Sequence, residues 1–292
     1  MAKQKTEIIT IVCNKGGVGR STTAINFAWS LAKKRKRVLV CDLDAQANCS
    51  SSLAINYNRD VVEYGKNITN LLKSSGESAS DYIVDTRNEK IKLLASTLML
   101  DSTEVEMKSL LDANIFRLFT HFFSRKLKSD FDYILFDTPP QKSSVLTLNA
   151  LLTSNWYWYI LSSEDQWSLD ARIVIKKIID DVKKLNPRIG PLPVLLTKYI
   201  NNSPQSKEMK SVAAEAFDSG VFKTAIPYSN IIAKSHGSRQ SIHEYAPDHV
   251  VANSYDRVAL SVGRFIGQNL SLIHISEPTR RTPISYAVFC LK

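Results

Sequence analysis

Short apolar runs alternate with longer amphipathic segments along most of this 292-residue chain. The apolar runs predict strands at residues 7–13, 37–44, 90–96, 131–137, 155–163 and 191–199, with a short one near 222–226. Helical periodicity falls between them, at residues 21–36, 101–128, 145–153, 169–185, 206–217 and 253–269. Strands joined by helices form parallel sheets with helical crossovers. We therefore expect an α/β fold with a doubly wound, mostly parallel sheet flanked by helices.

The whole chain has an ordinary globular composition, 44% hydrophobic and 23% charged, and residues 1–270 fit a single domain. The last 22 residues, 271–292, follow the final predicted helix and carry no clear period. Their closing "ISYAVFCL" resembles the in-frame translation of a commonly used sequencing-adapter oligonucleotide. We interpret this tail as non-native; a genuine irregular extension is the alternative.

Charge and cysteine usage narrow the class of protein. The formal net charge of +10 favours a polyanionic partner such as nucleic acid, a nucleotide or an anionic membrane. No CxxC pair and no disulfide framework are evident, which favours a reducing cytoplasm. No apolar run approaches the roughly 18 residues of a membrane span, so stable membrane insertion is not expected. Three histidines, for which we expect solvated or capping roles rather than zinc binding, are His236, His243 and His249.

A glycine-rich turn, "NKGGVGRSTT" at residues 14–23, joins the first predicted strand to the first predicted helix. Gly16, Gly17 and Gly19 leave room for backbone N–H groups to face a phosphate, and the helix N-terminus adds positive charge. A standard phosphate-binding loop would have Gly at position 14 and Lys at position 20. Asn14 and Arg20 both depart from that pattern.

Carboxylates follow two other predicted strands. Asp42 and Asp44 end the strand at 37–44, and Asp137 ends the strand at 131–137. Ligands of open α/β sheets bind at the carboxyl ends of strands, so these side chains and the glycine-rich turn are expected at one edge of the sheet.

Taken together, these segments resemble the deviant Walker A family of P-loop ATPases, and within it the ParA-type partition ATPases. Lys15 matches the early lysine that marks the family's loop. Asp42 and Asp44 match its second motif, with Ala45 where the family has proline, and Asp137 matches its Walker B aspartate. The resemblance covers roughly residues 5–268 and implies the P-loop NTPase fold.

The resemblance implies an ATPase that uses ATP and Mg²⁺ and forms ADP and phosphate. Its catalytic residues are Lys15, which reaches the partner's ATP across a dimer, Asp44, which orients water, and Asp42, which supports them. Ser21 and Asp137 hold the metal. The nucleotide-binding set is Lys15, Gly16, Gly17, Val18, Gly19, Arg20, Ser21 and Thr22.

The implied partners are a second copy of the chain, nonspecific DNA and a ParB-like centromere-binding protein, in a cytoplasmic, nucleoid-associated setting. The expected function is segregation of plasmid or chromosome DNA. Candidate DNA contacts, chosen from basic residues in the C-terminal third, are Lys207, Lys210, Lys223, Lys234, Arg239, Arg257 and Arg264.

Two alternatives stay open. Arg20 replaces a compact ammonium with a wide planar guanidinium, so slow hydrolysis is expected, and an ATP-gated DNA-binding scaffold is the extreme case. A MinD-like membrane-associated ATPase would need a C-terminal amphipathic helix, whereas residues 253–269 indicate a helix that packs on the core. A nitrogenase-reductase-like protein is excluded because no cysteine lies between Cys49 and Cys290.

Overall fold

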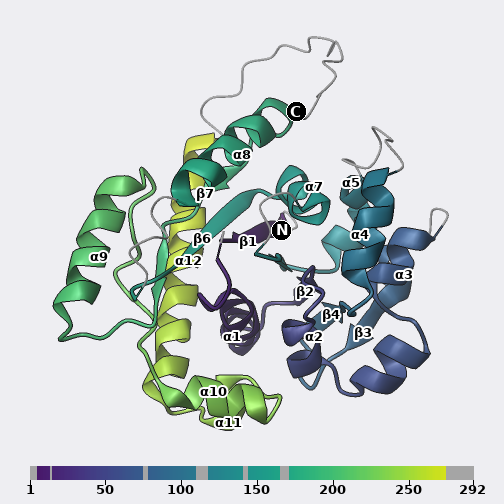
Figure 1. Cartoon of the computed structure of the whole chain (residues 1–292), viewed down its shortest axis with the longest axis horizontal. Coiled ribbons are helices and arrows are strands. Elements are labelled where there is room, and N and C mark those ends of the chain that lie inside the picture. The colour runs from purple at the N-terminus through teal and green to yellow at the C-terminus, as the bar shows by residue number, and fades with distance from the viewer. Residues whose placement is uncertain are drawn as a thin grey trace.

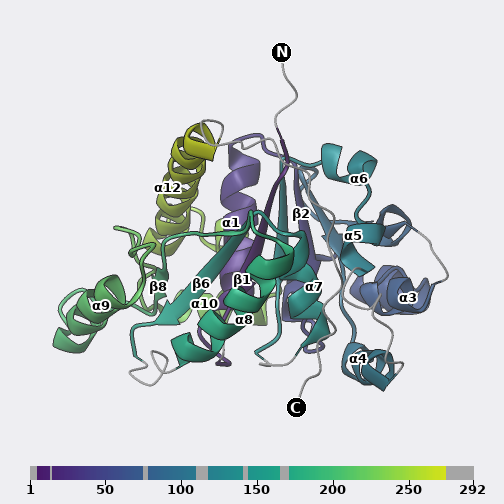
Figure 2. The ribbon, with the colours of Figure 1, turned by 90° about the horizontal axis from the view of Figure 1, so that it is seen from above.

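A twisted sheet with helices on both faces forms the centre of the molecule (Figures 1 and 2). The computed structural model describes residues 5–13, 15–74, 78–109, 118–140, 144–164 and 171–273, without side chains at 171–175 and 270–273. The strand order is β3-β4-β2-β5-β1-β6-β7, and β8 also pairs with β6. The pair β3–β4 is antiparallel and the other pairs are parallel. The predicted doubly wound, mostly parallel sheet is confirmed.

Most predicted strands form close to the expected residues. The strands are β1 (Glu7–Val12), β2 (Val38–Asp42), β3 (Ile83–Asp85), β4 (Ile91–Leu94), β5 (Tyr133–Asp137), β6 (Trp156–Ser162), β7 (Gly190–Pro191) and β8 (Leu195–Thr197). The expected strand at 191–199 is divided, because Pro193 has no N–H to donate to a ladder. The expected strand near 222–226 was wrong: around it lie only the isolated bridges Val194–Val221 and Tyr199–Pro227.

The helices differ more from expectation. They are α1 (Arg20–Lys33), α2 (Asn48–Leu53), the π-helix η1 (Tyr57–Glu63), α3 (Ile68–Lys73), the 3₁₀-helix η2 (Ala79–Tyr82), α4 (Leu100–Ser109), α5 (Leu118–Phe122), α6 (Arg125–Ser129), α7 (Val145–Thr153), α8 (Ala171–Leu185), α9 (Pro204–Ala216), α10 (Asn230–Gly237), α11 (Ile242–Tyr245) and α12 (Val250–Ile273).

Local caps explain where the helix predictions failed. The single helix expected at 101–128 is interrupted after α5, because α6 begins anew at Ser124, whose side chain accepts from the Leu127 amide; residues 110–117 of that prediction lie outside the described part of the chain. The polar loop expected before the last helix contains α10 and α11, each begun by a serine cap, Ser229 and Ser241. Helix α12 continues three residues past position 270, and residues 274–292 lie outside the described part of the chain.

Helix α1 is buried between the sheet and α12, as Figure 2 shows from above. Ile9 and Ile11 of β1 belong to the cluster on this face, with Phe27 of α1. Phe27 meets Trp158 of β6 edge to face, with ring centroids 5.0 Å apart. Fully burying a side chain of this size contributes roughly 1.5–3 kcal/mol. The central packing thus fixes the N-terminus of α1 against the carboxyl ends of the strands.

A polar junction ties α1 to α11 and α12. His243 Nε2 lies 3.1 Å from Ser30 Oγ and 3.0 Å from Asp256 Oδ1. The serine and the aspartate meet the same ring nitrogen, so this group cannot relay a proton as a Ser-His-Asp triad would. His243 is buried, and burial lowers its pKa. The expectation that His243 is solvated or caps a helix was therefore wrong, and its role is to join three helices.

Candidate functional site

Strand register brings the glycine-rich turn and the acidic residues to one edge of the sheet. Asp42 of β2 pairs in register with Asp137 of β5, and Asp137 pairs with Ile11 of β1, one residue before that strand ends. In Figure 1, α1 and α2 begin beside these strand ends. The sheet order β2-β5-β1 therefore places Asp137 between the second acidic segment and the turn.

The turn presents an uncapped helix N-terminus. Gly17 and Gly19 have φ of 75° and 92°, the left-handed region that favours glycine. Gly19 is the N-cap of α1, and neither a side-chain cap nor an acidic residue occupies the first turn. Within the described residues, no atom lies within 4 Å of a Cβ built at Gly16 or Gly17. Unpaired N–H groups, the helix dipole and this open space together suit a bound phosphate.

A threonine that the sequence prediction did not single out holds the turn in place. Thr197, at the end of β8, donates its hydroxyl to the Val18 carbonyl at 2.7 Å. Both residues are buried, and a Cβ added at Gly19 would meet the Thr197 methyl at 3.8 Å. The only signal in the sequence is a threonine at the carboxyl end of a predicted strand. Thr197 thus connects β8 to the middle of the glycine-rich turn.

Arg20 turns its side chain inward rather than into solvent. The residue is 7% exposed, and its Nη1 donates to the Thr138 carbonyl. Its Nη2 lies 4.0 Å from Asp44 Oδ2. The hydroxyl of Thr138 in turn donates to the Ile11 carbonyl at 2.7 Å. The guanidinium therefore spans the ends of β5 and β2, beside the buried carboxylates.

Asp42 is fully buried and held by three donors. Its Oδ2 accepts from the Ser50 amide at 2.8 Å and the Ser50 hydroxyl at 2.7 Å, and its Oδ1 accepts from the Asp44 amide at 3.1 Å. Burial and the neighbouring Asp137 raise the pKa of Asp42 to about 8, although these hydrogen bonds oppose the shift. Asp42 is thus fixed in orientation and resists ionisation.

Asp137 is equally buried, yet neither of its carboxylate oxygens has a hydrogen-bond partner in the described part of the chain. Burial raises its pKa to about 6, while Arg20 and Ser21 act in the opposite direction. An unpartnered buried carboxylate facing a second one is costly unless a cation compensates it. Oxygen donors of this kind suit Mg²⁺. The residues present therefore fit this metal.

The protein supplies only part of such a coordination shell. No set of three or more His, Cys, Asp or Glu side chains in the described ranges is arranged to hold a metal ion. Mg²⁺ usually keeps several waters and takes its remaining ligands from one or two carboxylates and substrate phosphates. Asp137 and Ser21 are the protein groups nearest to that role; Ser21 lowers the pKa of Asp137 although its hydroxyl makes no hydrogen bond of normal geometry to the carboxylate.

The other predicted residues fall in two groups. At the turn, Lys15 is exposed, and buried Thr22 places its hydroxyl 3.2 Å from His236 Nε2. The seven basic residues proposed for DNA are spread over α9, α10, α12 and the intervening segments. Lys210 Nζ donates to the Lys223 carbonyl at 3.1 Å, which joins two of them. The other exposed ones are Lys207, Lys234, Arg239, Arg257 and Arg264.

Known proteins resemble this chain in sequence and in fold. Residues 6–190 match the family described as an AAA domain. The chromosome-partitioning ATPase Soj of Thermus thermophilus is 30% identical over 264 residues, 90% of this chain and 97% of that protein. The chromosome partitioning protein ParA of Myxococcus xanthus is 31% identical over 224 residues, 75% of each chain. The structure of cobyrinic acid a,c-diamide synthase from Mycobacterium smegmatis with ADP and magnesium superposes with a TM-score of 0.73, at 25% identity, covering 90% of this chain and 96% of that one.

Removing one carboxylate from the buried pair should stabilise the protein in the absence of nucleotide and metal. A raised carboxyl pKa means that the folded state holds protons the unfolded state has lost, so stability falls as pH rises from about 4 towards 8. Asp137→Asn relieves that cost. We expect its free energy of unfolding in urea to exceed the wild-type value by roughly 1–3 kcal/mol at pH 8, and by less at pH 5.

Asp132→Asn provides the control, because the pKa of this carboxyl, at the opposite end of β5, shifts in the other direction. Burial raises its pKa, but hydrogen bonds and charge from Arg37 outweigh burial and lower it. We expect the control to lower stability above pH 4. A wild type that is more stable than Asp137→Asn at pH 8 would contradict the account of the pair.

Proposed function

The chain belongs to the AAA domain family and, within it, to the ParA-type partition ATPases; from this membership we propose that it binds and hydrolyses ATP with Mg²⁺ and binds DNA as an ATP-dependent dimer. The observation that carries the proposal is the meeting of an uncapped α1 N-terminus with the buried pair Asp42 and Asp137. The first suits phosphates and the second suits the metal that accompanies them. Sharing a fold with a cobyrinic acid synthase carries no function by itself.

The geometry supports a proposed role for each of these residues. The amides of residues 17–20 and the α1 N-terminus hold the phosphates, and Thr197 keeps the turn in position through Val18. Mg²⁺, when bound, neutralises charge that develops on the phosphates. Ser21 and Asp137 hold it, and Asp42 supports this group from β2. Asp44, next to these carboxylates, orients the attacking water.

Lys15 is the proposed contribution of one subunit to the other. It is exposed on the turn, which suits a side chain that must reach a neighbouring active site. A cation delivered to the transferring phosphate lowers the barrier in the way an arginine finger does. Hydrolysis would then depend on dimerisation.

Arg20 is the residue to which we attribute slow ATP hydrolysis in this chain. Its guanidinium is bonded to the Thr138 carbonyl and lies beside Asp44, so it must exchange these partners for phosphate oxygens. A planar fork bound to two groups is released less readily than a point charge on a flexible stem. We propose slow hydrolysis; the scaffold that scarcely hydrolyses ATP is the limiting case.

The proposed biological role is segregation of plasmid or chromosome DNA with a ParB-like centromere-binding partner, in the cytoplasm at the nucleoid. The net charge, which is still +8 without the last 22 residues, and the exposed basic residues of the C-terminal third support contact with DNA phosphates. The named relatives Soj and ParA are chromosome-partitioning proteins, which supports the same role.

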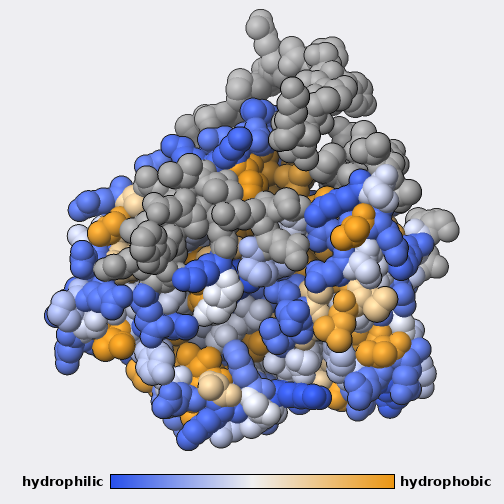
Figure 3. Space-filling view, in the orientation of Figure 1, coloured by the Kyte–Doolittle hydropathy of each residue, from blue (hydrophilic) through white to orange (hydrophobic). Residues whose placement is uncertain are grey.

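The membrane-associated alternative has less support. No helix in the described ranges is long and apolar enough to cross a bilayer. Helix α12 packs most of its described apolar side chains against the core, among them Val251, Tyr255 and Val258, and leaves Val250 and Leu260 exposed. The face seen in Figure 3 is mostly polar, with apolar residues in small separate patches. A liposome pull-down with anionic vesicles tests this alternative directly.

ATP-dependent, electrostatic DNA binding is the first test of the proposal. In fluorescence anisotropy with two unrelated duplexes, we expect binding with ATP and Mg²⁺, weak binding with ADP, and no sequence preference. The logarithm of the binding constant should fall with the logarithm of salt concentration with a slope of about −4 or steeper, because several phosphates are contacted. Binding that ignores nucleotide or salt would contradict the proposal.

Replacing Arg20 by lysine tests the slow step. We expect Arg20→Lys to raise ATP turnover by about threefold or more at saturating DNA, because the compact ammonium leaves Thr138 and Asp44 more readily. Arg37→Lys, an exposed arginine paired with Asp132, is the matched control and should leave turnover unchanged. Equal turnover of Arg20→Lys and wild type would show that arginine is fully competent.

A further inference from the structure

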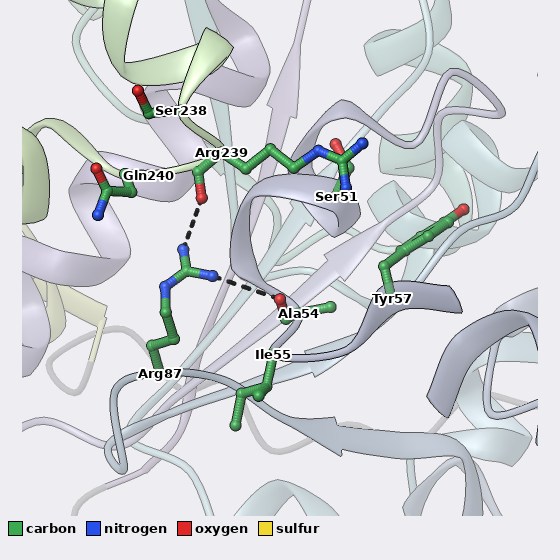
Figure 4. A pocket seen from close by; sticks show the side chains of 8 residues that line it. All are labelled: Ser51, Ala54, Ile55, Tyr57, Arg87, Ser238, Arg239 and Gln240. Atoms are coloured by element: carbon green, nitrogen blue, oxygen red, sulfur yellow. Dashed lines mark hydrogen bonds between the residues drawn. The ribbon is translucent and has the colours of Figure 1, made fainter. Parts of the chain in front are cut away.

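A small hollow lies away from the turn, between α2, η1 and the segment that joins α10 to α11 (Figure 4). Its volume is about 230 Å³, and its polar lining includes Ser51, Tyr57, Arg87, Arg239 and Gln240. None of the roles proposed above for nucleotide, metal or water uses these lining side chains. The hollow therefore needs an explanation of its own.

Arg87 lines the hollow, and its positive charge is neutralised by an ion pair. Its Nε donates to Glu244 Oε1 at 2.7 Å, so the two charges cancel. Its Nη2 donates to the Arg239 carbonyl at 2.8 Å, and its Nη1 donates to the Ala54 carbonyl at 3.4 Å. Figure 4 shows the last two contacts as dashed lines. Arg87 thus joins α2 to the segment after α10.

Arg239 is held in a conformation that its residue type disfavours. Its φ is 53°, in the left-handed region, and Arg87 fixes its carbonyl there. Its side chain extends across the hollow towards Ser51 in Figure 4 and is exposed. No ion pair of this side chain occurs among the described residues. Since Arg87 and Glu244 cancel, Arg239 leaves the hollow with one uncompensated positive charge. Such strain concentrates at functional sites.

Hydrogen bonds run from the hollow to the catalytic carboxylate. The Tyr57 hydroxyl donates to the Ser96 carbonyl at 3.0 Å, and the Ser96 amide donates to Ser50 Oγ at 2.8 Å. The Ser50 hydroxyl then donates to Asp42 at 2.7 Å. The Ser96 amide occupies one lone pair of the Ser50 hydroxyl. A movement of Tyr57 that shifts Ser96 would therefore alter the hydrogen bond from Ser50 to Asp42. Ser51 in the lining also follows Ser50 directly on α2.

We propose that this hollow seats a backbone phosphate of DNA, with Arg239 as its cation, and that Tyr57, Ser96 and Ser50 connect the occupied hollow to Asp42. The proposal rests on the DNA binding proposed above. DNA is the favoured source because a single exposed cation holds a free anion only weakly. A polyanion brings its phosphate to the hollow through its other contacts with a chain whose net charge is +8 without the last 22 residues.

The seat is tested by neutralising Arg239 in the full chain. With ATP and Mg²⁺, we expect Arg239→Gln to weaken DNA binding about three- to tenfold at 0.1 M salt and to reduce the salt slope by about 0.9, the loss of one phosphate contact. Arg125→Gln is the control, since Arg125 is exposed on α6, which contributes nothing to the hollow. If the two variants change DNA affinity and the salt slope equally, the proposed phosphate site is overturned.

Wild-type behaviour separates this proposal from the one on which it rests. Absence of DNA binding by the wild type would defeat both, whereas wild-type binding that Arg239→Gln leaves intact defeats only the seat. Inorganic phosphate alone, followed by thermal shift, covers the other source. Stabilisation by inorganic phosphate that Arg239→Gln removes would assign the hollow to a free anion and overturn DNA as its occupant.

The link to Asp42 has its own test, which keeps all charges. DNA and ATP must affect each other's affinity by the same factor. We expect Tyr57→Phe, which loses only the hydrogen bond to Ser96, to reduce the factor by which DNA strengthens ATP binding about threefold or more. Tyr64→Phe changes an exposed tyrosine of the next turn and should leave the factor intact. If DNA strengthens ATP binding by the same factor in Tyr57→Phe as in the wild type, the proposed link to Asp42 is overturned.

Discussion

Two buried carboxylates, Asp42 and Asp137, face each other across neighbouring strands, and the surrounding site is organised around their charge. Parallel register between β2 and β5 puts them there, and burial removes the water that would otherwise solvate them. Their raised pKa values express the cost of ionising both. A sheet that only needed stability would place apolar residues at these positions. The arrangement therefore implies a cation as part of the working protein.

Arg20 partly neutralises the negative charge of these carboxylates. Its guanidinium lies among Asp44, the Thr138 carbonyl and Asp137, whose pKa it lowers. Under the proposed function, a phosphate group with its metal would compete for the same region, so that Arg20 would be both a ligand of the nucleotide and a competitor for its place. The substitution is thereby more than an exchange of one cation for another. Under the proposed function, the contacts of Arg20 with the Thr138 carbonyl and Asp44 would have to break before phosphate can bind.

Local patterns predicted the sheet and the turn, whereas side-chain contacts between distant segments were beyond prediction. Apolar runs ending in aspartate and a glycine-rich turn are written in consecutive residues, so β1, β2, β5 and the site edge could be predicted. The six-residue α2 is too short to show a period. The inward direction of Arg20 depends on the Thr138 carbonyl, 118 residues away. Thr197 reaches Val18 over 179 residues. Such contacts exist only once the sheet has formed.

Proton release on nucleotide binding tests the central claim most directly. Calorimetric titration of Mg²⁺ and a nonhydrolysable ATP analogue at pH 7, repeated in buffers of different ionisation enthalpy, counts the protons released. Burial raises the pKa values of both Asp42 and Asp137, so we expect the pair to hold a proton in the free protein, which a bound cation should expel. We expect about one proton from the wild type and fewer from Asp42→Asn, in which only one carboxylate of the pair remains. Equal counts for the two proteins would contradict the claim that the carboxylate pair forms the cation site.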